Sequence, residues 1–261
     1  MILIDETAEV SSGAEIGEGV NIGPYAIVES GVVVGSDCML AAHGILRKGT
    51  ILGEGVKVDS FAVIGGDPQD LDFESDIESG VRIGAGCEIR EGVTIHRSSK
   101  ENGYTEVGSD SFLMGNCHIA HDCLVGSNCV IANGVLLGGH VQIGEDVFVG
   151  GAAAIHQFVR VGDGTMIAGL APISRDVPPY VTVAGRNQVC GLNMVGLRRR
   201  KIPMDSIADL KRCYLAVYAD LKNPGKLASK ASKDGHGSSE EGRRFLEFFQ
   251  AGSRTYCRPR K

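Results

Sequence analysis

Residues 118–126, "HIAHDCLVG", carry side chains capable of acid–base or metal chemistry. His118 and His121 lie three positions apart, Asp122 follows directly, and Cys123 comes next. A histidine titrates near neutral pH and can take a proton from a hydroxyl or amine, while a neighbouring carboxylate can orient its ring. The same residue types also bind zinc. The stretch therefore indicates a general base, a metal site or ordinary packing, and the elements that hold it distinguish these possibilities.

Aliphatic residues recur every six positions along most of the chain. The series runs from Ile4 to Ile64, resumes at Ile83 after a change of phase, and continues with one further gap to Ile173. Neither an α-helix nor an alternating strand has a period of six. Three short β-segments per turn, about 18 residues, would stack as coils roughly 4.8 Å apart. This pattern predicts a β-solenoid over residues 4 to about 185.

Composition agrees with a solenoid in a reducing compartment. There are 37 glycines, no tryptophan and only 5% aromatic residues, which suits a core of stacked aliphatic side chains. The net charge of -6 argues against nucleic-acid binding, and no apolar run is long enough for stable membrane insertion. The first ten residues do not form a secretory signal and the eight cysteines form no CxxC pair. We therefore expect a cytoplasmic protein.

The period separates packing residues from chemical ones. Five cysteines fall four positions after an aliphatic residue, in the small inward slot, and successive ones point to different faces, so they should fill the core: Cys38, Cys87, Cys117, Cys123 and Cys129. Stacking by 18 residues places Gly139 on His121 and His140 on Asp122, with both histidines facing outward. A base beside a carboxylate and a bare glycine amide is an arrangement suited to acyl transfer.

Two interruptions and a change of pattern divide the chain. Loops at 65–79 and 97–106 leave the repeat, and loops on a rigid scaffold often carry function. We expect residues 1–188 to form the solenoid and residues 189–261 a helical domain. Within the latter, the sequence predicts a helix near 191–202, one capped by Asp205 that runs to about Leu221, a flexible link at 223–239, and a last helix over 240–252 capped by Ser238 or Ser239.

Six motifs carry a closer resemblance: "IHR" (95–97), "HIAHDC" (118–123), "GGHV" (138–141), "HQF" (156–158), "DVPPY" (176–180) and "GLRRR" (196–200). In this order and spacing the chain resembles the acyl-ACP–UDP-N-acetylglucosamine O-acyltransferases of lipid A synthesis, within the hexapeptide-repeat acyltransferases. The resemblance implies an all-β solenoid, a left-handed parallel β-helix, with a C-terminal helical domain. It also implies a homotrimer that needs no metal or other cofactor and moves a 3-hydroxy fatty acyl group from acyl carrier protein to the 3-position of UDP-N-acetylglucosamine.

The resemblance assigns roles to individual residues. It implies that His121 is the general base, Asp122 its orienting partner and Gly139 the oxyanion donor. The implied substrate-binding residues are Gln69, Asp70, His96, His118, His140, His156 and Gln157 around the sugar, Gly169 beside the acyl chain, and Asn193, Arg199 and Arg200 at the nucleotide and diphosphate. The basic residues 198–201 would suit an acidic carrier protein.

Alternatives remain at this stage. The related gamma-class carbonic anhydrases hold zinc with three histidines, a role that His118, His121 and His140 would fill, although the helical tail has no use in such an enzyme. Asp72 stands where the acyltransferases usually have lysine, and Val195 where they commonly have an acid. The acceptor could thus be the 3-hydroxyl, a 3-amino analogue or another UDP-amino sugar, and a non-catalytic solenoid that binds nucleotide sugar is a further possibility.

Overall fold

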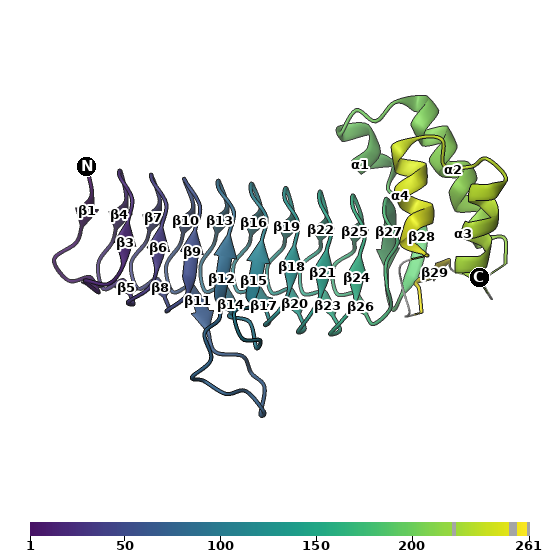
Figure 1. Cartoon of the computed structure of the whole chain (residues 1–261). Helices are drawn as coiled ribbons and strands as arrows, with labels where there is room; N and C mark the ends of the chain where they lie inside the picture. The colour runs from purple at the N-terminus through teal and green to yellow at the C-terminus, as the bar shows by residue number, and fades with distance from the viewer. Residues whose placement is uncertain (221–222, 251–254, 260–261) are drawn as a thin grey trace.

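The computed structural model describes residues 1–220, 223–250 and 255–259. Short parallel strands wind into a long three-sided β-helix, and helices gather at its C-terminal end (Figure 1). None of the helices in these ranges combines the length and apolar composition needed to span a bilayer.

Each side of the prism is one sheet, built from every third strand. Sheet A contains β1 (Leu3–Ile4), β4 (Asn21–Ile22), β7 (Met39–Leu40), β10 (Lys57–Val58), β13 (Glu88–Ile89), β16 (Phe112–Leu113), β19 (Val130–Ile131), β22 (Phe148–Val149), β25 (Met166–Ile167), β27 (Val181–Ala184), β28 (Gln188–Leu192) and β29 (Arg258–Pro259). Sheet B contains β2 (Glu9–Val10), β5 (Ile27–Val28), β8 (Ile45–Leu46), β11 (Val63–Gly66), β14 (Thr94–His96), β17 (His118–Ile119), β20 (Leu136–Leu137), β23 (Ala154–Ile155) and β26 (Pro172–Ile173). Sheet C contains β3 (Glu15–Ile16), β6 (Val33–Val34), β9 (Thr50–Leu52), β12 (Gly80–Ile83), β15 (Tyr104–Val107), β18 (Leu124–Val125), β21 (Gln142–Ile143) and β24 (Arg160–Val161).

The predicted inward ladder is confirmed by the register. Ile119 pairs with Leu137, which pairs with Ile155, and all three are buried. The five cysteines assigned to the core are buried as well, and burial raises the pKa of the Cys123 thiol to about 12. A thiol that resists ionisation is a poor metal ligand and a poor nucleophile, so these cysteines act in packing.

Both predicted interruptions leave the coil as loops, of residues 67–79 and 97–103; they are shorter than predicted because residues 65–66 belong to β11 and residues 104–106 to β15. The chain between β11 and β12 projects far from the body, and the shorter loop between β14 and β15 lies beside it (Figure 1). These insertions change the coil length locally, so that Thr94 stacks on His118, 24 positions later, rather than 18.

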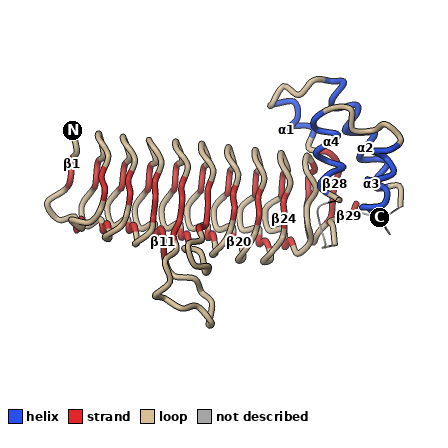
Figure 2. Tube along the Cα trace, in the orientation of Figure 1, coloured by secondary structure: helices blue, strands red, loops and turns tan. Residues whose placement is uncertain are grey.

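The C-terminal helices are α1 (Met194–Arg199), α2 (Met204–Tyr218), α3 (Pro224–Lys233) and α4 (Glu240–Phe248), drawn in blue in Figure 2. Ser239 caps α4 as predicted, accepting a bond of 3.0 Å from the Gly242 amide. Ahead of the helices, β28 adds an antiparallel strand to β27, so sheet A extends to Leu192.

Two expectations for this region are wrong. Residues 223–239 contain α3 instead of a flexible link, because Ala228 and Ala231 on one face bury against the neighbouring helices. Asp205 lies in the first turn of α2, and Pro203 occupies the N-cap position without a side-chain bond. The predicted helix ends at Leu221 and residue 252 lie outside the described residues.

Candidate active site

His121 and Asp122 lie at the edge where sheet B meets sheet C. His121 and Asp122 form the turn between β17 and β18, and Gly139 and His140 form the same turn one coil later. Asp122 and His140 have left-handed backbones, with φ of 60° and 61°, which few non-glycine residues adopt. Stacked turns hold them there, since the His140 amide donates to the His121 carbonyl at 3.0 Å. The coil therefore fixes the direction of both side chains.

Asp122 is held as an ionised acceptor. His121 Nδ1 lies 2.7 Å from Asp122 Oδ2, the Ser98 hydroxyl 2.6 Å from Oδ1, and the Ser99 hydroxyl and amide 2.7 and 3.2 Å from Oδ2. Burial opposes ionisation, but the bonds from Ser98, His121 and Ser99 hold the pKa of this carboxyl well below its usual range. An ionised carboxylate cannot donate, so the proton between them resides on His121 Nδ1. The lone pair of Nε2 is left available as a base.

Gly139 lies directly against that lone pair. A Cβ atom added at Gly139 would stand only 2.6 Å from His121 Nε2, so the base occupies the space that a side chain would fill. The Gly139 amide donates to no acceptor in the described part of the chain. His121 Nε2 and a residue with an unused N–H donor thus lie side by side, and proton removal and oxyanion stabilisation require both kinds of group.

The surroundings of three nearby histidines favour their neutral forms. Burial, with the nearby rings of His118 and His121, lowers the pKa of His96 to about 4. Burial also lowers the pKa of His118 and, against the attraction of Asp122, that of His140. Neutral imidazoles can donate one hydrogen bond and accept another, which suits recognition of sugar hydroxyls.

Ring contacts fix these histidines in place. His96 packs edge-on against His118 with centroids 4.6 Å apart, and His118 Nδ1 bonds to the Thr94 hydroxyl at 2.7 Å. His140 stacks on the ring of Phe158 at 4.5 Å. The site is therefore organised before any substrate binds.

A metal bound through Asp122 would have to displace existing bonds. Ligand atoms of His121, Asp122 and His140 lie within 4.8 Å of one another, which is close enough to be considered for metal binding. However, Asp122 Oδ2 already accepts from His121 Nδ1 and from Ser99. His118, the remaining histidine of the imagined zinc set, bonds through Nδ1 to Thr94. The occupied carboxylate of Asp122 therefore favours its assignment as an acceptor for the His121 ring over its assignment as a metal ligand.

The loop of residues 67–79 brings further polar groups toward the pair. Gln69 and Asp70 are exposed on it, and Asp70 is close enough to His140 to oppose the lowering of its pKa. His156 and Gln157 are exposed on the next turn along the same edge. These residues therefore belong to one edge of the prism, as expected from the 18-residue stacking.

The remaining predicted residues lie at the other two edges. Gly169 is exposed at the edge between sheets A and B. Asn193, Arg199 and Arg200 line a pocket of about 580 Å³ at the edge between sheets C and A, together with Phe148 and Met166. Within one chain, the width of sheet C separates this pocket from His121.

This second pocket is suited to an anion. Arg200 Nη1 pairs with Asp146 at 3.3 Å, while Nη2 is buried and has no hydrogen-bond partner among the described residues. Arg199 is exposed at the pocket wall. Asn193 has a structural role as well, since its side chain caps α1 and donates to the Gly164 carbonyl at 3.0 Å. A diphosphate would supply acceptors for the Arg200 guanidinium.

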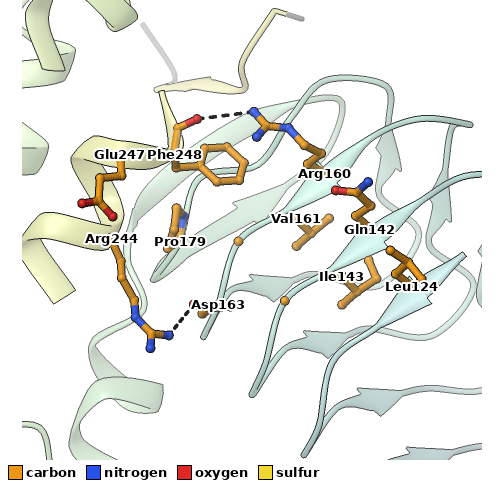
Figure 3. A pocket seen from close by; sticks show the side chains of 12 residues that line it. Leu124, Gln142, Ile143, Arg160, Val161, Asp163, Pro179, Arg244, Glu247 and Phe248 are labelled. Carbon is orange, nitrogen blue, oxygen red and sulfur yellow. Dashed lines mark hydrogen bonds and ion pairs between the residues drawn. The ribbon is translucent and has the colours of Figure 1, made fainter. Parts of the chain in front are cut away.

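A third hollow, of about 540 Å³, lies between the outer face of sheet C and α4 (Figure 3). Its charged groups are already paired: Arg244 bonds to Asp163 at 2.9 Å, and Arg160 bonds to the Phe248 carbonyl and to buried Asp176. These contacts join the helical domain to the solenoid, and we assign the hollow to that docking.

Sequence reasoning did not single out Ser98 and Ser99 as partners of Asp122. Both lie in the flagged loop after "IHR", but stacking by 18 residues does not bring them to Asp122. The insertion lengthens the offset to 24, which joins Ser98 to Asp122. A register that counted the inserted residues would have found the contact.

The buried His96 predicts an acid sensitivity of the fold. Its folded pKa, about 4, lies below the unfolded value near 6.5, so as pH falls the unfolded chain takes up the proton first. The stabilisation from neutral His96 is complete above pH 6.5 and is lost as pH falls toward 4. Urea unfolding across this window should show a smaller loss of unfolding free energy for His96→Gln than for the wild type. Exposed His156→Gln is the matched control, and equal pH dependence in all three proteins would contradict the prediction.

Comparison with known proteins connects this geometry to a family. The protein-family model described as Udp N-acetylglucosamine O-acyltransferase, domain 2, matches residues 176–257. The family model for the bacterial transferase hexapeptide matches residues 13–48 and 104–139. The chain is 38% identical over 257 residues to the acyl-[acyl-carrier-protein]–UDP-N-acetylglucosamine O-acyltransferase of Thermodesulfovibrio yellowstonii, covering 98% of this chain and 99% of that one. It is 43% identical over 202 residues to the protein of that name from Campylobacter lari, covering 77% of each.

The fold agrees with a solved relative. The UDP-N-acetylglucosamine acyltransferase from Campylobacter jejuni superposes with a TM-score of 0.92 at 34% identity, covering 98% of this chain and all of that chain. Together with the hexapeptide match, this likeness confirms the expected left-handed parallel β-helix with a helical C-terminal region.

Proposed function

Because the chain belongs to the acyl-ACP–UDP-N-acetylglucosamine O-acyltransferases of lipid A synthesis, we propose that it moves a 3-hydroxy fatty acyl group from acyl carrier protein to the 3-hydroxyl of UDP-N-acetylglucosamine, with His121 as general base. The observation that carries this proposal is the position of His121 Nε2 against the bare Gly139 amide, with Nδ1 held by Asp122.

The reaction follows from these three groups. His121 Nε2 takes the proton of the acceptor hydroxyl as its oxygen attacks the thioester carbonyl carbon. The carbonyl oxygen becomes an oxyanion, which the Gly139 N–H stabilises, and Asp122 stabilises the imidazolium. The intermediate collapses with loss of the carrier protein's thiolate, which takes the proton from His121. One ester forms, one thioester breaks, and His121 returns to its starting state.

We propose that a second copy of the chain completes the site. The base lies at the edge between sheets B and C, and the arginine pocket lies at the edge between sheets C and A, so one copy must offer one edge to the other edge of its neighbour. Three copies around an axis would place the edge between sheets B and C of each copy against the edge between sheets C and A of its neighbour. Exposed apolar side chains on sheets A and B support this arrangement, namely Phe148, Leu136 and Pro172.

Mixed assemblies should reveal the shared site. His121→Ala and Arg200→Met should each be nearly inactive alone, because each removes one half of every site. When equal amounts are co-assembled, about one quarter of the sites should pair an intact base with an intact arginine, each drawn at random from two chains. We therefore expect about a quarter of wild-type turnover in the mixture, measured as thiol release from acyl carrier protein.

The control is a mixture assembled from chains that carry both substitutions and wild-type chains. Its sites require two wild-type neighbours, so it should also retain about a quarter of the activity. Absence of recovery when the two single variants are co-assembled would show that base and arginine act within one chain.

An amine acceptor is the second candidate. Asp70 and Asp72 lie together on the loop of residues 67–79, where the Asp72 amide donates to Asp70 Oδ1 at 3.1 Å. Two acids there would favour the binding of a 3-amino sugar in its protonated form. Equal amounts of UDP-N-acetylglucosamine and its 3-amino analogue, offered with 3-hydroxyacyl carrier protein, would decide. An alkali-labile ester supports the main proposal, an alkali-stable amide supports the alternative, and no product from either would leave the chain a binding solenoid.

The carrier protein and the compartment complete the proposal. Arg198 and Arg199 are exposed in the last turn of α1, and they would attract an acidic carrier despite the negative net charge. The cysteines among the described residues are free thiols, in keeping with a reducing cytoplasm. We therefore place the reaction in the cytoplasm.

A further inference from the structure

We propose that Arg97 is a positioning residue that clamps the loop of residues 67–79 to the coil bearing the His121–Asp122 pair, and so holds the sugar-binding residues of the loop in the conformation that binds the acceptor. The inference deepens the proposed function and rests on it, because the loop carries Gln69 and Asp70, which we assign to the sugar. The clamp itself is a property of the folded chain and can be measured without substrate.

The guanidinium of Arg97 reaches both ends of the loop. Its Nε donates to Asp67 Oδ1 at 2.8 Å, where the loop leaves the solenoid. One Nη donates to the Ile77 carbonyl at 2.8 Å and to the Ser79 hydroxyl at 3.3 Å, and the other to the Ser75 carbonyl at 2.7 Å. Four of its N–H groups are thus used, and the side chain is only 12% exposed. One planar group therefore ties the beginning of the loop to its end.

Few other contacts hold the loop, and they lie at its returning end, where the Asn102 amide donates to the Glu78 carbonyl at 2.6 Å and the Ser79 hydroxyl donates to the Ser98 carbonyl. Apart from Pro68, none of its residues is buried, and Leu71 is fully exposed. Phe73 lies under the Arg97 guanidinium, 4.8 Å from its centre, and so adds to the same anchor. The Lys48–Glu78 ion pair is largely exposed and contributes little. Without Arg97 the loop would lose its main connection to the solenoid.

The residues that follow Arg97 also hold the carboxylate of Asp122. Ser98 follows Arg97 directly, accepts a bond of 2.6 Å from the Ser79 hydroxyl through its carbonyl, and donates to Asp122 at 2.6 Å. Three consecutive residues, 97 to 99, therefore fix the substrate loop on one side and Asp122 on the other. Release of the loop would therefore weaken acceptor binding while the His121–Asp122 bond stays in place.

This geometry predicts a selective kinetic defect. In Arg97→Lys a single ammonium cannot reach the acceptors at both ends of the loop. We expect KM for UDP-N-acetylglucosamine to rise about tenfold or more, with kcat and KM for acyl carrier protein changed less than about threefold and the pH–rate profile unchanged. In Arg97→Ala, millimolar guanidinium should restore much of the lost sugar affinity, and ammonium should not.

The deciding experiment combines kinetics with hydrogen exchange of the full-length protein in the absence of substrate. Arg97→Lys should exchange the amides of 67–79 faster than the wild type, with strands β17 and β20 unchanged. The matched control is Arg82→Lys, at a more exposed arginine that pairs with Glu106 and covers the Tyr104 ring on sheet C. Unchanged exchange in 67–79 would overturn the clamp, even if the protein proved not to be a transferase. Equal rises in both KM values, or a fall in kcat alone, would overturn its link to sugar binding.

Discussion

Replacing His121 with alanine should lower kcat by about 10³-fold, within the range of about 10² to 10⁴ that general acid–base catalysis contributes. The reason is that no other group is placed to take the proton: Asp122 is committed to its hydrogen bonds, and His140 Nε2 faces Asp122 at 3.8 Å. KM values should change little. The measurement is the initial rate of thiol release from acyl carrier protein, with saturating UDP-N-acetylglucosamine.

The fold should survive this change, because His121 lies in an edge turn outside the aliphatic core. A melting temperature close to that of the wild type would show this. The matched control is His43→Ala, a histidine in an exposed turn of an earlier coil, which should retain nearly full activity. A His121→Ala protein that kept more than about a tenth of the wild-type kcat would show that His121 is not the base.

The second large effect is expected at Gly139. An alanine Cβ would lie 2.6 Å from Nε2 and 2.7 Å from Cε1 of His121, and the ring cannot move away without breaking its 2.7 Å bond to Asp122. The added methyl group also covers the amide that we assign to the oxyanion. We expect Gly139→Ala to lower kcat by about 10²-fold or more. Steady-state kinetics with both substrates saturating provides the measurement.

Gly115→Ala is the control for the effect of adding a methyl group to a turn of this solenoid. There a Cβ would first meet the amide end of the Asn133 side chain, at 3.2 Å, which can shift. Its kcat should stay within about twofold of the wild type, since it touches neither half of the site. A Gly139→Ala enzyme as active as Gly115→Ala would exclude Gly139 from the reaction.

Much of the site could be predicted because a solenoid translates sequence spacing directly into space. The six-residue period fixes which side chains point inward, so Cys123 was separable from His121 and Asp122 although all three are neighbours. The 18-residue coil then placed Gly139 against His121, as the structure confirms. The hand of the helix does not follow from this period, and it was supplied by the family resemblance.

The sequence predicted contacts less accurately where the six-residue period breaks. The insertions that change the coil length concealed the bonds from Ser98 and Ser99 to Asp122. In the helical domain, α3 was missed because its buried face consists of small alanines in a polar segment, which gives no strong apolar signal. The separation of Arg200 from His121 depends on which edge of the prism each residue occupies, and only the sheet assignment makes that evident.

The central claim is that this chain makes an ester on UDP-N-acetylglucosamine using His121. Its most direct test is mass spectrometry of the nucleotide sugar after incubation with 3-hydroxyacyl carrier protein and either the wild type or His121→Ala. We expect one alkali-labile acyl group per sugar, formed with equimolar release of carrier thiol, and a rate about 10³-fold lower in the variant. No acylated nucleotide sugar from the wild type, or equal rates from both proteins, would contradict it.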